Sequence, residues 1–331
     1  MSNQMRTHSP RTRQAGVSLI ELMISLVLGL LVVGAAIGVF ATNKQTYRAT
    51  QSLGRVQENG QVAFEMLSRD IREAGATPCD VNMPPGNIID GATTAAPDGA
   101  SWFFATAFPL FGFEGGGPAH VAGTDVIQVL RTGDDIRSST ADLTASATAV
   151  TYEPGNPGFK SGDPVMICDM KVLGVFRANG DSTTGASGSV SFDAGAGINA
   201  CGYFPQPNAV ACSDPATAYA FPRFATISSL QGIRWFLRDA DGDASNGYSL
   251  YRQVNGASVE EVVQGVTDLQ FRYLTDAGYV DAGSLAGAAA WKNVRAVRMR
   301  LVLRDTEATG TDGEPITRTI ENVVTLRNRV L

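Results

Sequence analysis

The sequence predicts an α+β protein, in which one long amino-terminal helix packs on a globular domain built mainly from antiparallel β-strands. Three observations support this fold class. An uncharged apolar run covers residues 22–41. Helical periodicity then continues in amphipathic form to residue 74. Farther along, short segments alternate apolar and polar residues and are separated by turn dipeptides such as Asp-Gly and Asn-Gly, as in a sheet with one solvated face.

The apolar run from Leu22 to Ala41 is long enough to cross a membrane. As a helix its 20 residues span about 30 Å, the thickness of the hydrocarbon core. Arg6, Arg11 and Arg13 precede it, which predicts a cytoplasmic amino terminus and an exported carboxyl side. The run exceeds the apolar part of a secretory signal, and no Ala-x-Ala site leading into a loop follows it. We therefore expect a single-pass membrane helix that is retained.

A carboxylate, Glu21, lies at the edge of this run in the segment Gly16-Val-Ser-Leu-Ile-Glu. A charge at mid-membrane costs roughly 2.5–3.5 kcal/mol, so such an acid is expected to have a partner. Cleavage after Gly16 would create one, the α-amino group of Val17, one helical turn away or on a neighbouring chain. The alternative is a glutamate that simply reaches the lipid headgroups.

These residues resemble the class III signal of type IV pilins and pseudopilins. In that family a prepilin peptidase cuts after a glycine and methylates the new amino terminus. The family's usual Phe-Thr-Leu-Ile-Glu is here Val17-Ser-Leu-Ile-Glu21, with two departures that leave the glycine and the glutamate in place. The resemblance implies that residues 1–16 are a cleaved leader and that Val17 becomes the methylated first residue. It also implies that Glu21 neutralises the amino terminus of an adjacent subunit in a filament.

The helix is predicted to continue from residue 17 to residue 74, about 87 Å in length. Residues 17–41 would face lipid before assembly, or other helices in a filament, and residues 42–75 would pack on the globular domain. Gly75 and Pro78 are placed to end the helix. The positions of its second half that recur at three- and four-residue steps are Leu53, Val56, Gly60, Phe64, Leu67, Ile71 and Ala74.

Three segments resemble PilW-type minor pilins: residues 55–75, which contain Gln-Glu-Asn-Gly and Arg-Asp-Ile-Arg, and residues 265–273 and 318–328. The resemblance implies a type IV pilin-like fold and a structural subunit that helps to start or cap a filament. Its partners would be other minor pilins, the major pilin, the prepilin peptidase and an inner-membrane assembly platform. Adhesion, twitching motility or DNA uptake would be roles of the whole system.

Three other functions fit parts of the same pattern. A J-type pseudopilin of type II secretion shares the long helix and the β-domain. A membrane-anchored periplasmic binding protein would never polymerise and would not be cut after Gly16. An adhesive or DNA-capturing tip subunit would use residues 76–225, a region in which we find no assignable motif.

Residues 76–331 are predicted to form the exported β-rich domain, starting with a loop region at 76–120. Abundant glycine (36 residues) and sparse charge (18%) favour β-structure with many turns. The expected strands are 125–131, 164–169, 172–177, 190–192, 230–237, 248–254, 266–274, 294–304 and 316–327.

The charge balance argues against nucleic-acid binding by the mature domain as a whole. Without residues 1–16 the chain has 23 basic and 32 acidic residues, a formal charge of −9. An acidic body repels a phosphate backbone.

Four cysteines, Cys79, Cys168, Cys201 and Cys212, are expected to form disulfides in an exported protein. They permit three pairings. A bond between Cys201 and Cys212 would close a short loop and leave Cys79 to pair with Cys168. Four reduced, buried thiols are the alternative.

Neither a cofactor nor an enzymatic activity is expected. Asp239, Asp241 and Asp243 alternate as calcium ligands do, but a solvated hairpin turn gathers the same residues. The chain has two histidines, His8 in the leader and His120 in a glycine-rich loop, and no phosphate-binding loop.

Overall fold

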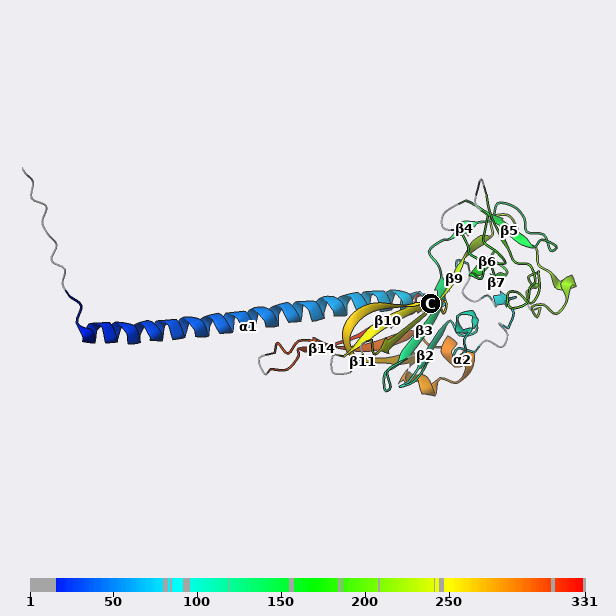
Figure 1. Cartoon of the computed structure of the whole chain (residues 1–331). Helices are drawn as coiled ribbons and strands as arrows, with labels where there is room; N and C mark the ends of the chain where they lie inside the picture. Colours follow the sequence, from blue (N-terminus) through cyan, green and yellow to red (C-terminus); the bar gives the residue numbers. More distant parts are fainter. Residues whose placement is uncertain are drawn as a thin grey trace, which may run out of the picture.

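A long helix projects from a β-rich body in the computed structural model (Figure 1). The leader before Gly16 and the calcium candidate Asp241 lie outside the residues that the structure describes. The described residues are 16–79, 83, 85–91, 96–118, 120–154, 158–183, 185, 187–207, 209–240, 242–243, 247–310 and 313–329.

The projecting element is α1, Leu19–Arg72, a single helix of 54 residues. The predicted helix is confirmed, with two residues fewer at each end. Ser18 is extended (ψ 144°) and precedes the first turn. At the other end Gly75 adopts the left-handed conformation (φ 73°), which glycine accepts without steric cost, and its N–H donates to the Leu130 carbonyl. That bond fixes the helix exit on the sheet.

The body is mainly antiparallel. Its strands are β1 (Pro85–Asn87), β2 (Leu110–Phe113), β3 (Val126–Thr132), β4 (Arg137–Ser138), β5 (Ala149–Tyr152), β6 (Pro164–Cys168), β7 (Leu173–Arg177), β8 (Gly188–Ser191), β9 (Thr226–Arg238), β10 (Tyr248–Val254), β11 (Val259–Thr275), β12 (Gly278–Val280), β13 (Ala296–Arg304) and β14 (Thr317–Thr325). The short helices are η2 (Trp102–Phe104), η3 (Pro215–Thr217), η5 (Ala282–Ser284), α2 (Gly287–Lys292) and η6 (Arg327–Arg329).

Among the described residues twelve strands join one sheet, with the central order β1-β7-β6-β9-β10-β11-β13-β14. Strands β5 and β8 form a separate two-stranded sheet. Of the pairings in the large sheet, β1 with β7 is parallel and the others are antiparallel. The predicted α+β class is therefore confirmed.

Strand β9 belongs to two halves of the body. Its first residues, 226–229, pair with β4 and β6. From Leu230 onward it pairs with β3, and from Ile233 with β10. We call the second half of α1 together with β2, β3, β9 from Leu230, and β10–β14 the helix-proximal half, and residues 137–228 with β1 the distal lobe. Figure 1 shows the distal lobe beyond the carboxyl end of α1, away from the helix amino terminus.

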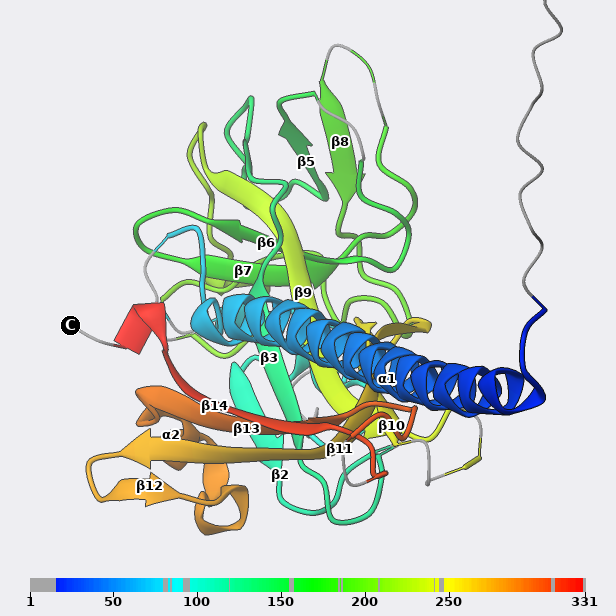
Figure 2. The same cartoon turned by 90° about the vertical axis from the view of Figure 1, so that its left-hand side faces the viewer.

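The two halves have separate cores. In the helix-proximal half α1 crosses one face of the sheet (Figure 2), and its buried side chains meet Trp235, Phe271 and Leu301. The distal core is rich in aromatic residues. Phe204 is its centre, with ring centroids of three other phenylalanines at 4.9–5.7 Å. Those neighbours are Phe176, Phe192 and Phe221.

Most predicted strands are present, and the differences have physical reasons. The 248–254 strand is confirmed with its bounds. Strand β9 begins four residues earlier than predicted, because its first residues pair with the distant strands β4 and β6. Strand β11 begins seven residues earlier, because its first residues complete a hairpin with β10. The predicted loop at 76–120 contains β1, η2 and β2, so that prediction is wrong in part. Gly112 of β2 leaves room for the Tyr273 ring, since a Cβ there would lie 1.9 Å from its hydroxyl oxygen.

Candidate assembly surface

The first half of α1 has no partner within the described chain. Its large apolar side chains from Leu19 to Phe40 are 54–79% exposed. By length and composition α1 is long and apolar enough to cross a membrane, and its most apolar window has no buried residue. A water-exposed apolar surface of this size is unfavourable, so it requires lipid or other apolar helices.

The predicted processing residues lie at the amino end of this surface. Gly16 and Val17 precede the helix, outside regular secondary structure, and Val17 is 69% exposed. An ideal Cβ on Gly16 would meet no atom within 4 Å, so no other described part of the chain covers this residue. Cleavage after Gly16 and methylation of Val17 stay predictions.

Glu21 lies in the first turn of α1 and is exposed. An acid there is favourable, because the helix dipole is positive at its amino end. The first basic residue after it is Lys44, more than six turns farther along α1. Within the described residues Glu21 therefore lacks a cationic partner, and a partner inside an apolar assembly has to be a chain amino terminus or come from another molecule.

The second half of α1 packs on the sheet through one stripe. The buried residues of this stripe are Val56, Gly60, Ala63, Leu67 and Ile71, followed by Ala74 just after the helix. The predicted amphipathic face is confirmed, except that Ala63 rather than Phe64 is fully buried and Leu53 is half-buried.

Gly60 is the point of closest approach between helix and sheet. A Cβ built there would lie 2.3 Å from Ile320 Cδ1 and 3.3 Å from Leu303 Cδ1. The glycine of the Gln-Glu-Asn-Gly segment therefore lets α1 lie directly on β13 and β14. On the same helix Gly54 has open space around its Cα and serves as a natural comparison.

A buried carboxylate, Asp70, ties the last turn of α1 to the sheet. Its Oδ2 accepts hydrogen bonds from Trp235 Nε1 at 2.9 Å and from Arg252 Nε at 3.0 Å. Arg131 Nε lies 3.5 Å from Oδ1 and forms an ion pair with it. Asp70 is only 3% exposed, so its charge is compensated by donors from β3, β9 and β10.

Arg131 extends this cluster to the surface. Its Nη1 lies 3.0 Å from Glu73 Oε2 and 3.4 Å from Asp134 Oδ1. Arg69 on the outer side of α1 lies 3.4 Å from the same aspartate. The Arg-Asp-Ile-Arg segment thus places alternating charges at the helix end. Asp70 is the charged residue of this segment whose side chain points into the protein.

Asp70 belongs to the Arg-Asp-Ile-Arg motif, from which no role for this residue is predicted. One signal could have singled it out, since residue 70 lies on the helix face that also carries Leu67 and Ala74. A carboxylate on an apolar face calls for a buried donor. The identity of its donors, Trp235 and Arg252, was not accessible from sequence spacing.

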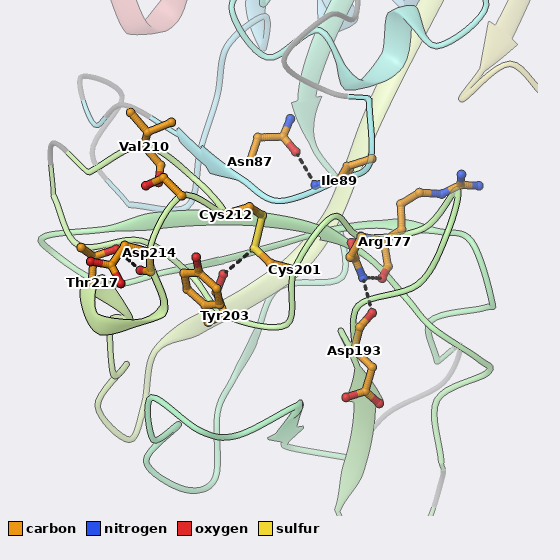
Figure 3. The surroundings of a disulfide bond; sticks show 12 residues. Asn87, Ile89, Arg177, Asp193, Cys201, Tyr203, Val210, Cys212, Asp214 and Thr217 are labelled. Atoms are coloured by element: carbon orange, nitrogen blue, oxygen red, sulfur yellow. Dashed lines mark hydrogen bonds between the residues drawn. A yellow bond between two sulfur atoms is a disulfide. The ribbon is translucent and has the colours of Figure 1, made fainter.

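Both expected disulfides are present in the pairing that the short loop suggested. Cys79 bonds Cys168, with Cα atoms 6.3 Å apart, and joins the segment after α1 to the end of β6. Cys201 bonds Cys212, with Cα atoms 5.4 Å apart, and closes the loop that carries Val210 (Figure 3). The first bridge links the two halves, and the second lies within the distal lobe.

The calcium candidate loop lies between β9 and β10, as expected of a hairpin. Asp239 Oδ1 accepts the Gly242 N–H at 2.8 Å, an ordinary turn contact. Asp243 has an interaction of its own, and Asp241 lies outside the described residues. Within the described part of the chain no group of three or more His, Cys, Asp or Glu side chains could hold a metal ion. The expectation that this loop is a solvated turn without a cofactor stays a prediction.

Comparisons with known families agree with this arrangement. Residues 240–328 match the family described as type IV pilus-assembly protein W, and residues 11–37 match the prokaryotic N-terminal methylation motif. A comparison with curated proteins found no match. The first match covers β10–β14, the strands that carry much of the sheet under α1, and the second covers Gly16, Val17 and Glu21. The two matches confirm the resemblance to PilW-like minor pilins of type IV pili.

Proposed function

We propose that this chain, which resembles PilW-like proteins of type IV pili, is a structural subunit that takes part in the initiation or the tip of the filament. It is cut after Gly16, and Val17 becomes its methylated first residue. Its mechanism is assembly: the apolar halves of several α1 helices bundle together, and the globular bodies remain outside the bundle. The observation that supports this is the exposed apolar first half of α1, whose first turn carries an acid, Glu21, without a cationic partner among the described residues.

Glu21 provides the electrostatic contribution to assembly. The amino group of Val17 that cleavage releases is positive, and it would lie four residues before Glu21 on the same chain or beside Glu21 of a neighbour. In an apolar bundle an ion pair is screened little and each unpaired charge is costly. Pairing therefore favours one axial position of a subunit relative to its neighbour.

Membrane anchoring precedes assembly in this proposal. The prepilin-like signal and the apolar helix support an anchored protein. Arg6, Arg11 and Arg13 would keep the amino terminus in the cytoplasm, and the β-rich body would lie in the periplasm of a bacterium. The partners would be the prepilin peptidase, the assembly platform, other minor pilins and the major pilin.

A position at the tip is supported by the distal lobe. It lies beyond the carboxyl end of α1, on the side away from the membrane segment (Figure 1). A subunit inside a filament has another subunit stacked on that side, whereas a tip subunit has free space there. A structural role without catalysis accords with this position.

Mass spectrometry of the mature amino terminus tests the first step. Protein purified from membranes that contain active prepilin peptidase should begin at an N-methylated Val17. A variant with Gly16→Ala is the matched control and should keep residues 1–16. An intact Met1 in the wild-type protein would overturn the assignment.

The charge pair is tested by Glu21→Ala. The variant should fold and be processed but should fail to enter sheared pili. Glu58→Ala removes an exposed acid from the second half of the same helix and should enter pili normally. Equal incorporation of both variants would contradict the pairing role.

A J-type pseudopilin of type II secretion is the second candidate, and the match to the pilus-assembly family favours the pilus. Cross-linking in cells should capture pilus subunits rather than secretion components. A chain that stays monomeric in the membranes of piliated cells would instead support an anchored binding protein.

A further inference from the structure

A cavity of about 280 Å³ lies where α1 ends, between the two halves of the body. The helix exit forms one side of it. The other walls are apolar side chains from four strands: Leu130 of β3, Met166 of β6, Leu173 of β7 and Leu230 of β9, each at most 5% exposed. The cavity is therefore lined by both the helix-proximal half and the distal lobe.

The polar side chains at the cavity are uncharged or positively charged. They are Thr77 after α1, Thr106 after η2, Lys292 at the end of α2, and Asn328 and Arg329 at the end of the described chain. Two of the five are cations. No acidic residue lines the cavity among those that the structure describes, although the whole chain has a net charge of −6.

Two of these groups lack hydrogen-bond partners. The Asn328 Nδ2 and Thr77 Oγ1 atoms are buried and make no hydrogen bond. Nδ2 can only donate, so it requires an acceptor. Buried donors in native proteins are almost always satisfied, and a cavity lined by unsatisfied donors favours an occupant that carries acceptor atoms.

Arg329 adds a positive charge that is not neutralised by the described residues. Its Nη1 donates to the backbone carbonyls of Trp291 and Val294, which are uncharged acceptors. Burial lowers the pKa of Arg329 to about 10, so the guanidinium remains protonated at neutral pH although its charge is partly desolvated. An anion beside it would restore the balance of charge.

We propose that this cavity binds a small apolar carboxylate, with its tail on the apolar walls and its carboxylate at Lys292, Asn328 and Arg329. A neutral apolar ligand would leave the donors unsatisfied, and a cation would be repelled. The volume lies just below the range of about 300–1,000 Å³ for ligand pockets, which fits a ligand no larger than one amino-acid residue or a short-chain acid.

An occupant would also contact both halves of the body at once. Met166 and Leu173 belong to the distal lobe, and Lys292 and Arg329 belong to the helix-proximal side. Binding would therefore hold the distal lobe in one orientation relative to α1. This inference does not depend on filament formation, because the cavity is complete in one chain.

The test uses the full chain in detergent micelles and 4-phenylbutyrate as the probe, measured by isothermal titration calorimetry. Its matched analogues are 4-phenylbutyramide, which has the same shape without the charge, and 4-phenylbutylamine, which has the opposite charge. The carboxylate should bind at least about tenfold more tightly than the amide, since charge-assisted hydrogen bonds are about twice as strong as neutral ones, and the amine should bind weakest. Equal binding of the three compounds, or no binding, would overturn the proposal.

Variants then locate the site. Lys292→Glu reverses an exposed charge at the cavity and should weaken binding of 4-phenylbutyrate at least about tenfold. Lys171→Glu makes the same change on the exposed β6–β7 turn, outside the lining, and should leave binding unchanged. An equal effect of the two variants would show that the probe senses only net charge and would overturn the site.

Two further probes distinguish the sources of such a carboxylate. Octanoate represents a free acid, and acetyl-Phe with a free carboxylate represents the end of a polypeptide, with its carboxamide as control. The acid that displaces 4-phenylbutyrate identifies the source. Displacement by the peptide carboxamide as readily as by the free peptide would contradict recognition of the carboxylate.

Discussion

The helix-proximal half and the distal lobe are stabilised in different ways. The first is a helix on a regular sheet, with an alternating apolar pattern, one close helix–sheet approach at Gly60 and a buried ion cluster at Asp70. The second combines short strands with loops around an aromatic core and has a disulfide within it. The match to the pilus-assembly family lies wholly in the helix-proximal half. The helix-proximal half therefore has a regular pattern that can be recognised in its sequence, and the distal lobe does not.

In the distal lobe, side-chain hydrogen bonds between loops and strands replace part of the backbone hydrogen bonding that a sheet would provide. Asn199 is 1% exposed; its side-chain oxygen accepts the Arg177 N–H, and its amide donates to the carbonyls of Arg177 and Asp193. This one side chain bridges β7 and the loop that contains Asp193. Figure 3 shows its two partners, Arg177 and Asp193, in the surroundings of the Cys201–Cys212 bond. Such contacts are specific but leave no periodic signature in the sequence.

Asp70→Ala should have the largest effect on the helix-proximal half. It leaves Arg131 and Arg252 without their buried carboxylate and should lower the free energy of unfolding by about 3–5 kcal/mol. Urea unfolding followed by tryptophan fluorescence measures this loss. Asp134→Ala removes a carboxylate that is 72% exposed from the same cluster and should cost about 0–1 kcal/mol. Similar losses for the two variants would refute the central role of Asp70.

Replacing Cys201 and Cys212 together by serine tests whether the distal lobe is a separate unit. The bond spans 11 positions, and its loss should cost about 2–4 kcal/mol. Hydrogen exchange should accelerate in β5–β8 and remain slow in β10–β13. Uniform acceleration throughout the body would mean that the two halves unfold together.

Gly60→Ala tests the close approach of α1 to the sheet. The new methyl group would meet Ile320, and overpacking should cost about 1–3 kcal/mol. Gly54→Ala on the same helix meets no atom and should stabilise the protein by about 0.5–1 kcal/mol. Thermal unfolding of both variants gives the comparison, and a shift of the same sign in both would rule out a packing role for Gly60.

Tyr219→Phe should have the smallest effect, and it lies in the distal lobe. The hydroxyl donates to Asp169 Oδ2 at 2.6 Å, and burial, with help from that carboxylate, raises the pKa of Tyr219 to about 12. Because the pKa is raised from 10 on folding, its stabilisation is fully present below pH 10 and is lost as the pH rises through about 12. The variant should lose about 0.5–1.5 kcal/mol below pH 10.

Absorbance titration checks the same group directly. Wild-type protein should show a tyrosine ionising near pH 12 that Tyr219→Phe lacks. Tyr47→Phe changes a side chain that is 70% exposed and should leave that step in place. A wild-type titration without the late step would contradict the assigned hydrogen bond.

The sequence predicted the helix and much of the sheet because their signals are local. An uncharged run of 20 residues and a three- to four-residue period determine α1 almost to its ends. Strands such as β10 and β13 alternate clearly and carry their own evidence. Strand β2, Leu-Phe-Gly-Phe, has no alternation, and its place depends on pairing with β3.

The contacts that define the site are long-range and therefore could not be predicted. Asp70 is separated from Trp235 by 165 positions and from Arg252 by 182. The aromatic core of the distal lobe gathers Phe176 and Phe204 in the same way. Sequence reasoning could identify an acid on an apolar face, but its donors follow only from the sheet topology.

The attachment of α1 determines how tension would pass through the body. A pull on the helix first reaches the segment between β13 and β14, through the Ser52–Thr309 hydrogen bond and the Arg55–Asp305 ion pair. It then reaches β13 and β14 at Gly60, and after them β3, β9 and β10 through Asp70. The distal lobe receives it afterwards, through the continuous strand β9 and the Cys79–Cys168 bond, which act in parallel. A force that pulls α1 away from the sheet is therefore resisted by the sheet before it can deform the surface of the distal lobe.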